Sequence, residues 1–419
     1  MNLNRRDFLK MSSVGGLAFF LEMMKPELIS LASKVDPSGF PKMLYREYGQ
    51  TGKRVSILGF GGMRFDSESV RKGNLEDSAR VMVEAYDLGV NYFDTAPTYV
   101  GGKSEEIFGL AFKEIDRKMK DQKSPLPYYY TSKSGDLKGA EMRRRLETTL
   151  TRLGKSKLHF YHMWCIMDYN HFQEVMKPGG SYEAAVAAKK EGLIEHIVFS
   201  SHAGSQDTIK MLNEKVFDGM LIGYNILNFP KQEKAIQAAI DHKMGVVIMN
   251  PLAGGLIPQH QDYFNKLVSP DQKGISVVQT ALNFIMGQQG ITVALAGITN
   301  QKQLHENVKA LNYLEIFSDQ KLASLKKQYL KKIEDICTTC QYCNVCPVDI
   351  PVWTVMEFFN EYILKGKDHA IRSLDSYKRY EKVDIKAEIK KCIRCRACEK
   401  ACTQHLPILE RFDIITGQL

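Results

Sequence analysis

Between residues 44 and 314, short apolar runs alternate with longer stretches in which apolar residues recur at helical spacing. The apolar runs predict eight strands, near residues 57–61, 91–94, 128–133, 158–164, 196–200, 220–224, 245–249 and 292–296. The intervening stretches, such as 75–88, 104–119, 140–153 and 231–243, predict helices. Eight alternations over about 270 residues indicate the α/β class, and favour a closed (β/α)8 barrel over an open doubly wound sheet. In such a barrel, functional residues gather at the C-terminal ends of the strands.

Three further segments complete the predicted organisation. Residues 45–56, with Gly49 and Gly52 between polar and apolar flanks, predict a hairpin that closes the barrel bottom. The barrel is expected to span residues 44–315, and a lysine-rich linker helix capped by Ser318 to span residues 316–336. A small helical domain is expected over residues 337–419, with an amphipathic helix near 355–364.

Composition excludes several classes of protein. With 419 residues, 44% apolar and 25% charged, the chain can bury a sizeable core, so neither a disordered chain nor a membrane bundle is expected. The formal net charge is +9, but no basic face interleaved with aromatic residues appears, so no nucleic-acid partner is expected. Part of the basicity is local, because the segment from Gln320 to the C-terminus holds 18 Lys and Arg against 13 Asp and Glu.

Eight of the nine cysteines lie in the last 83 residues, and Cys165 stands apart. The first run is Cys337, Cys340, Cys343 and Cys346, and the second is Cys392, Cys395, Cys398 and Cys402. Three thiolates at three-residue spacing wrap one face of a [4Fe-4S] cube, and the fourth cysteine of each run then joins the other cluster. We therefore expect Cys402 to complete the first triplet and Cys346 the second.

Two alternatives to this metal site are a disulfide framework and structural zinc. Tight runs at three-residue spacing fit a metal cage better than disulfides. Two four-cysteine zinc sites are usually built from cysteine pairs instead of triplets. Two clusters with their thiolates would each carry a charge of −2, which would reduce the local surplus of +5 to about +1.

The N-terminal segment, residues 1–35, resembles a twin-arginine export signal. Arg5 and Arg6 precede a short, mildly apolar stretch that ends at Glu22 and is too short to span a bilayer. The sequence therefore predicts a bacterial protein exported to the periplasm, with no transmembrane segment in the mature chain. If this segment is instead an ordinary amphipathic helix, the protein is expected in the cytoplasm.

Residues 89–99 (GVNYFDTAPTY) and 130–133 (YTSK) resemble the second and third strand ends of the aldo/keto reductase superfamily. The resemblance covers the whole barrel and implies that Asp94, Tyr99 and Lys133 belong to a catalytic tetrad. In carbonyl reduction a hydride goes to carbon and a proton to the developing alkoxide, so Tyr99 would be the general acid. The Lys133 ammonium would lower the pKa of Tyr99, and Asp94 would hold Lys133 in place.

The fourth tetrad position departs from the family, which has a His at the end of strand four. Here Trp164 stands at that place, and its indole can donate a hydrogen bond but cannot relay a proton near pH 7. His162, one layer deeper on the same strand, is expected to be a packed barrel residue. His202, after strand five, is the other candidate to replace the missing His.

The resemblance also implies a site for a nicotinamide cofactor, NAD or NADP. Gly62 and Met63 would approach it after strand one, Ser200 and Ser201 would hold the carboxamide, and Tyr224 or Met249 would cover the nicotinamide ring. The family's usual Gln on strand six falls at Leu221. The remaining implied contacts are Asp94, then Pro251, Leu252 and Gly254 near the diphosphate, Gly297, Thr299 and Gln303 at the positions that usually bind the 2′-phosphate, and Glu306 and Asn307 near the adenine. Only Lys302 offers positive charge in residues 297–303, so the sequence does not distinguish NAD from NADP.

The cysteine runs resemble a helical dicluster ferredoxin module, and the combination resembles the bacterial iron–sulfur aldo/keto reductases. Two departures are the two residues between Cys343 and Cys346, and Thr403 where Pro usually follows the last cysteine. The chain is therefore predicted to be an NAD(P)-dependent oxidoreductase with two [4Fe-4S] clusters, a small-molecule substrate and a possible redox partner protein. The alternative is a non-catalytic barrel with an iron–sulfur electron-transfer, redox-sensing or docking role.

Overall fold

The computed structural model describes residues 39–268, 274–324, 336–337, 341–402 and 404–419. Residues 43–419 form one compact unit, which includes the barrel and the C-terminal helices. Within the described residues, no helix has the length and apolar character needed to cross a bilayer.

The barrel consists of eight parallel strands closed in the order β10-β3-β4-β5-β6-β7-β8-β9. The strands are β3 (Leu58–Gly61), β4 (Tyr92–Asp94), β5 (Tyr129–Ser134), β6 (Leu158–Ile166), β7 (Ile194–Ser201), β8 (Gly219–Gly223), β9 (Gly245–Met249) and β10 (Val293–Gly297). Short, almost fully buried apolar strands are typical of a parallel sheet that is covered on both faces. The predicted (β/α)8 fold is confirmed, with each strand starting or ending within two residues of its expected place.

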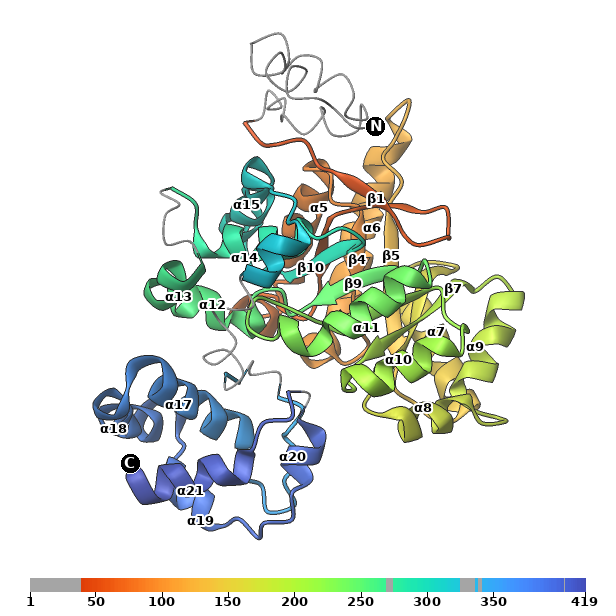
Figure 1. Ribbon diagram of the computed structural model, residues 1–419. Helices are drawn as coiled ribbons and strands as arrows, with labels where there is room; N and C mark the ends of the chain where they lie inside the picture. The colour runs from red at the N-terminus through yellow and green to blue at the C-terminus, as the bar shows by residue number, and fades with distance from the viewer. Residues whose placement is uncertain (1–38, 269–273, 325–335, 338–340, 403) are drawn as a thin grey trace, which may run out of the picture. The chain divides into compact units, whose positions relative to one another are not determined.

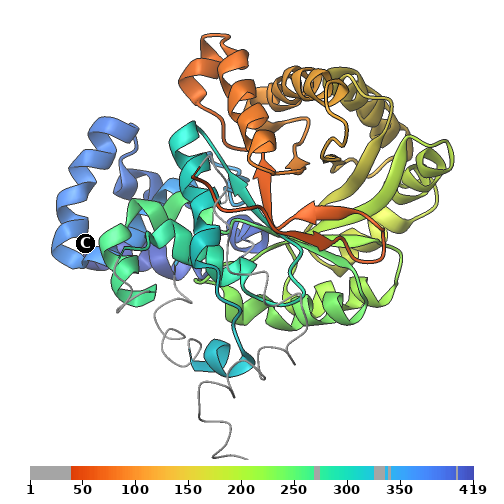
Figure 2. The same ribbon diagram turned by 90° about the horizontal axis from the view of Figure 1, so that it is seen from above.

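Helices cover the outside of the barrel, as Figures 1 and 2 show. They are α4 (Ser67–Arg71), α5 (Leu75–Asp87), η1 (Tyr99–Gly102), α6 (Ser104–Lys120), α7 (Gly139–Leu153), α8 (Tyr169–Met176), α9 (Ser181–Lys190), α10 (Ser205–Asn213), α11 (Phe229–Asp241), η2 (Ala253–Gly255), α12 (Leu256–Gln259), α13 (Gln261–Val268), α14 (Val277–Met286), α15 (Gln301–Lys309) and η3 (Ala310–Tyr313). Apolar residues at helical spacing explain the longer of these helices, because one stripe of each faces the sheet. In α6, for example, Ile107, Phe108, Ala111, Phe112 and Ile115 are all buried.

The bottom of the barrel is closed by the hairpin of β1 (Tyr45–Glu47) and β2 (Arg54–Ser56). Its turn carries Tyr48, which is fully buried and lies with its ring centroid 4.1 Å from that of Phe160. A Cβ at Gly245 would come within 2.2 Å of the Tyr48 ring, and one at Gly219 within 2.5 Å. Both glycines are therefore required for this plug to fit.

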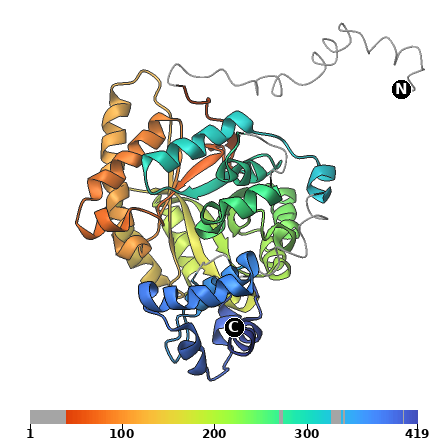
Figure 3. The ribbon, with the colours of Figure 1, turned by 90° about the vertical axis from the view of Figure 1, so that its left-hand side faces the viewer.

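The C-terminal part is helical and has a core of its own. Its helices are α17 (Val352–Lys365), α18 (Lys367–Ser376), η4 (Tyr377–Glu381), α19 (Ile385–Lys390), α20 (Ala397–Ala401) and α21 (Ile408–Gln418), visible in Figure 3. Phe358, Ile385 and Phe412 pack in this core beside the described cysteines Cys337, Cys343, Cys398 and Cys402. Of the predicted linker helix, residues 319–324 are helical and Ser318 Oγ accepts from Lys321 N–H (3.3 Å), whereas residues 325–335 lie outside the described part.

The two cysteine runs end in the same kind of turn. Asp349 N–H donates to the carbonyl of Cys346 (3.1 Å), and His405 N–H donates to the carbonyl of Cys402 (3.0 Å). Asp349 and His405 both have positive φ, at 55° and 52°. Helices α17 and α21 then begin after Pro351 and Pro407. The described residues after Cys346 and after Cys402 thus share one turn and one helix start.

Candidate active site

The C-terminal ends of β4 and β5 hold a buried ion pair. Lys133 Nζ lies 2.6 and 2.7 Å from the two carboxylate oxygens of Asp94. Thr131 Oγ1 donates a further hydrogen bond of 3.0 Å to Asp94 Oδ2. Lys133 is 0% and Asp94 2% exposed, so each charge is compensated almost entirely by the other.

Tyr99 follows β4 in the short helix η1 and lies over this pair. Lys133 Nζ is 5.3 Å from the centroid of the Tyr99 ring. The next residue, Val100, has φ of +54°, a left-handed conformation that is rare for a β-branched side chain. Strain of this kind is commonly found where a loop must aim a side chain into a site.

Trp164 meets Tyr99 from the end of β6. The two ring centroids are 5.8 Å apart at an interplanar angle of 85°, an edge-to-face contact. The register of β6 on β7 gains one residue between Met163 and Ile166, and Cys165 in this bulge has φ of +61°. Cys165 N–H donates to Ser200 Oγ at 2.7 Å, which fixes the bulge. Bulges re-aim side chains, and this one accompanies the half-buried Trp164 at the mouth.

The two candidate histidines lie in different surroundings. His162 is fully buried in the barrel, with Nε2 3.7 Å from Asp94 Oδ2. Burial and the charge of Lys133 lower the pKa of His162 well below its usual range, so this residue stays neutral. His202 follows β7, and burial lowers its pKa to about 3. Its Nε2 shares a hydrogen bond of 3.1 Å with the hydroxyl of Tyr342, which lies between Cys340 and Cys343 in sequence.

The pKa of Tyr99 differs from the sequence-based expectation. Burial, followed by the charges of Asp94 and Cys165, raises the pKa of the Tyr99 hydroxyl well above its usual range. These effects outweigh the lowering expected from the nearby Lys133 ammonium. Tyr99 is therefore protonated at neutral pH, as a proton donor must be.

Gly62, in the turn after the first barrel strand, packs closely against α6. A Cβ at Gly62 would come within 2.5 Å of both the Phe108 ring and Ser104 Oγ. Gly62 N–H donates to the carbonyl of Asp94 (2.7 Å), and Ser104 Oγ donates to the carbonyl of Gly62 (2.8 Å). Met63 is 47% exposed beside this turn.

The residues predicted around the nicotinamide are partly engaged within the protein. Ser200 Oγ accepts from Cys165 N–H, and Ser201 Oγ lies 2.7 Å from Thr208 Oγ1. Tyr224 is fully buried and its hydroxyl donates to Gln288 Oε1 at 2.9 Å. Of the two side chains expected over the nicotinamide ring, Met249 is the one that lines a pocket, together with Ser201 and His202.

The predicted adenosine contacts lie at the end of β10 and along α15. Gly297 ends β10, and Thr299 N–H donates to Gln303 Oε1 at 2.8 Å. Glu306 is half-buried and Asn307 is 2% exposed on α15. After the neighbouring strand β9, Pro251 and Leu252 lead into η2, where Gly254 has φ of +68°.

Sequence reasoning missed Arg64. This exposed residue follows β3, and its Nη2 donates to the carbonyl of Gly254 at 3.5 Å. The contacts predicted after the first strand end at Met63, one residue before it. The signal available was a basic residue directly after a glycine turn.

Comparison with known proteins identifies the family. The sequence profile of the aldo/keto reductase family matches residues 57–329. The chain belongs to the aldo/keto reductase family. Among curated relatives of the reductase, an uncharacterized oxidoreductase, YrpG of Bacillus subtilis, is 26% identical over 333 residues, covering 70% of this chain and 96% of that protein.

Solved structures of the family share the barrel. Aldo-keto reductase AKR11C1 from Bacillus halodurans, in its holo form, superposes with a TM-score of 0.55 at 21% identity and covers 68% of this reductase and 96% of its own chain. An aldo-keto reductase from Klebsiella pneumoniae in complex with NADPH gives a TM-score of 0.53 at 21% identity, with coverage of 68% and 96%. The expectation of an oxidoreductase of the aldo/keto reductase type is thus confirmed at the level of the family, and the family profile does not extend over residues 330–419.

Proposed function

We propose that this aldo/keto reductase reduces the carbonyl group of a small molecule with a nicotinamide cofactor, and that Asp94, Tyr99, Lys133 and Trp164 form its catalytic centre. The observation that carries the proposal is the contact of these four side chains at three neighbouring strand ends. Barrel enzymes place their chemistry at this end of the strands.

The side chains of the protein account for the proton transfer in this reaction. The reduced nicotinamide, when bound, supplies a hydride to the carbonyl carbon. Tyr99 gives its hydroxyl proton to the carbonyl oxygen, and Lys133, held by Asp94, stabilises the negative charge that remains on the tyrosine. Trp164 offers an indole N–H that can orient the carbonyl oxygen but has no proton that titrates near neutral pH.

The test is to purify the protein without oxygen and titrate it with NADPH and NADH. NADPH is the first probe because the Klebsiella pneumoniae relative was solved with it. A turnover screen with aldehydes, ketones, quinones and viologen dyes would then define the substrate class. Failure to bind either nucleotide would overturn the proposal and favour a non-catalytic barrel.

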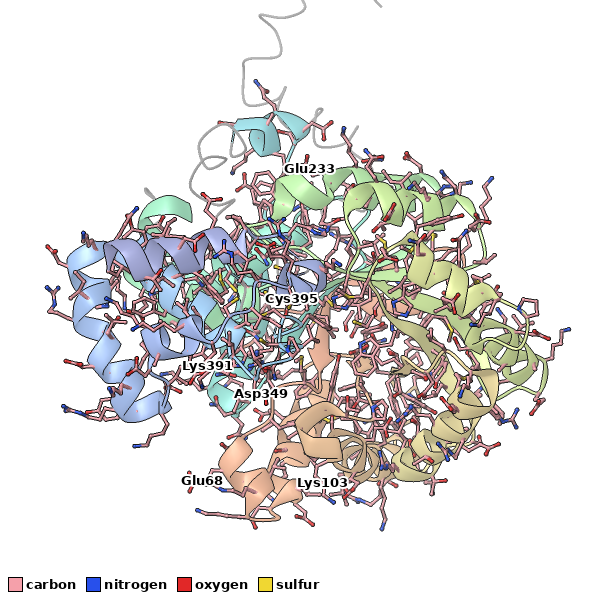
Figure 4. All side chains as sticks on the ribbon, turned by 90° about the horizontal axis from the view of Figure 1, so that it is seen from below. Glu68, Lys103, Glu233, Asp349, Lys391 and Cys395 are labelled. Carbon is pink, nitrogen blue, oxygen red and sulfur yellow. The ribbon has the colours of Figure 1, made fainter. Side chains whose placement is uncertain are left out.

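We also propose that the C-terminal module holds two [4Fe-4S] clusters. Cys346, Cys392, Cys395 and Cys398 line a single pocket. This set combines the second triplet with the last cysteine of the first run, as expected for exchanged ligands. Arg394 and Arg396, with φ of +56° and +60°, turn the backbone on either side of Cys395, which is exposed and labelled in Figure 4.

Other features of the described residues agree with sulfur ligation. Arg394 N–H donates to Cys392 Sγ (3.4 Å), and Leu406 N–H donates to Cys402 Sγ (3.5 Å). The described cysteines form no disulfide, and Cys340 lies outside the described residues. No group of three or more His, Cys, Asp or Glu in the described part is arranged around a single ion. A [4Fe-4S] cluster differs from a single-ion site because each of its irons binds its own cysteine. The four cysteine sulfurs therefore need not converge on one point.

Exchange of ligands can be tested with two matched variants. Cys402→Ala should damage the cluster of the first triplet, and Cys346→Ala should damage that of the second. Iron and acid-labile sulfide should each approach about eight per wild-type chain, and electron paramagnetic resonance of the reduced protein separates the two clusters. Damage by each substitution to the cluster of its own run would contradict the exchange, and zinc without iron would contradict the clusters.

We propose export by the twin-arginine pathway, although residues 1–38 lie outside the described part. The motivation is the Arg5-Arg6 pair before a short apolar stretch. Changing both arginines to lysine keeps the charge but removes the twin-arginine signal that the export machinery recognises, so the protein should remain in the cytoplasm. Fractionation of a bacterial host should show this shift, and an unchanged distribution would contradict export by this route.

A further inference from the structure

Arg64 connects two segments that the family resemblance places around the cofactor phosphates. Its Nη2 reaches the carbonyl of Gly254 in the loop after β9, at 3.5 Å. A Cβ at Gly297, the last residue of β10, would come within 2.8 Å of Arg64 Cγ and 3.0 Å of its Cβ. The aliphatic stem therefore crosses the end of β10, and the guanidinium extends to the loop after β9.

Closure of the barrel brings these segments together. β10 pairs with β3, with Gly297 opposite Gly61, and on its other side β10 pairs with β9. Arg64 is three residues beyond Gly61, so it leaves the barrel at the same level as Gly297. Residues about 190 and 233 positions apart in the chain thus meet at one seam.

The charge of Arg64 is not neutralised within the described residues. No described carboxylate lies within 4 Å of its guanidinium, and the nearby Asp66 caps α4 by accepting from Glu68 N–H and Ser69 N–H. The bond to Gly254 is long and uses one of five donors. A planar guanidinium with free donors matches phosphate oxygens well.

The positions expected to recognise a phosphate after β10 offer no such group. Gly297 and Thr299 carry no charge, and the Gln303 side chain accepts from Thr299 N–H. An anionic cofactor that lies along this seam would therefore meet the positive charge of Arg64, which follows β3.

We propose that Arg64 binds the diphosphate of the nicotinamide cofactor. This inference rests on the proposed function, because it requires that a nicotinamide nucleotide binds at all. The diphosphate is favoured over the 2′-phosphate because the guanidinium lies at the Gly254 loop, whereas only the stem lies at Gly297.

The test measures dissociation constants of NADPH and NADH by quenching of protein fluorescence. Arg64→Leu should weaken both nucleotides about equally, by about 10- to 100-fold, the usual effect of losing a hydrogen bond to a charged group. The dissociation constants of Arg64→Lys should lie between those of the wild type and of Arg64→Leu, since lysine keeps the charge but lacks the planar guanidinium. Arg80→Leu is the matched control, because Arg80 is an exposed arginine on α5. Circular dichroism should show unchanged folding, as expected for an exposed side chain.

Each outcome has a distinct meaning. Equal weakening of NADPH and NADH supports the diphosphate assignment. Weakening of NADPH alone would overturn it in favour of the 2′-phosphate, and unchanged constants in Arg64→Leu would overturn any phosphate role. Absence of binding in the wild-type protein would instead overturn the proposed function, and the two failures are thereby separated.

Discussion

Replacing Tyr99 by Phe is expected to lower the rate of carbonyl reduction by about two to four powers of ten, the usual contribution of a general acid. The substitution removes only the hydroxyl, so the edge-to-face contact with Trp164 can persist. Affinity for NADPH should stay within about twofold, because the hydroxyl is assigned to the substrate oxygen and not to the cofactor. Single-turnover rates and NADPH titrations on the same preparation measure both effects.

Two companion variants sharpen this result. Tyr380→Phe removes the hydroxyl of a tyrosine that is 72% exposed and should leave the rate unchanged. Trp164→His restores the family's usual residue and should keep or raise carbonyl reduction. An undiminished rate in Tyr99→Phe would remove Tyr99 from the catalytic centre.

Breaking the Asp94–Lys133 pair should have the largest effect on stability. Asp94→Asn leaves the Lys133 ammonium buried without a counter-charge, which is expected to reduce the free energy of unfolding by about 3–5 kcal/mol. The double variant Asp94→Asn, Lys133→Met should recover much of this loss, because no unpaired charge remains. Urea unfolding followed by circular dichroism measures these differences.

Asp77→Asn supplies the matched control for this pair. Asp77 also pairs with a basic residue, Arg80, but the Asp77 side chain is 49% exposed. Its loss should change the free energy of unfolding by about 0.5 kcal/mol or less. If Asp94→Asn were no more damaging than Asp77→Asn, the buried pair could not be the structural centre of the site.

Much of the fold could be predicted because the barrel repeats one simple pattern. A strand such as β9 is apolar throughout, since both of its faces are covered, and a helix such as α6 is apolar along one stripe. These patterns are local and can be recognised in the sequence. The two consecutive helices α8 and α9 between β6 and β7 depart from the simple alternation of one strand and one helix.

The site could be predicted only where the family motif is continuous in sequence. Asp94 and Tyr99 lie within one motif, and Lys133 ends the next strand. Arg64 was missed because its partners, Gly254 and Gly297, come from strands that meet β3 only when the barrel closes. The rise in the pKa of Tyr99 was not predicted because its main cause, burial, is a property of the folded chain.

The Tyr48 plug has a consequence for how protons are replaced. In the proposed reaction Tyr99 gives up a proton, and another must arrive from solvent before the next cycle. Tyr48 is fully buried against Phe160 between Gly219 and Gly245, so its side chain fills the lower end of the barrel. We therefore expect the proton to return through the mouth, where the half-buried Trp164 meets Tyr99.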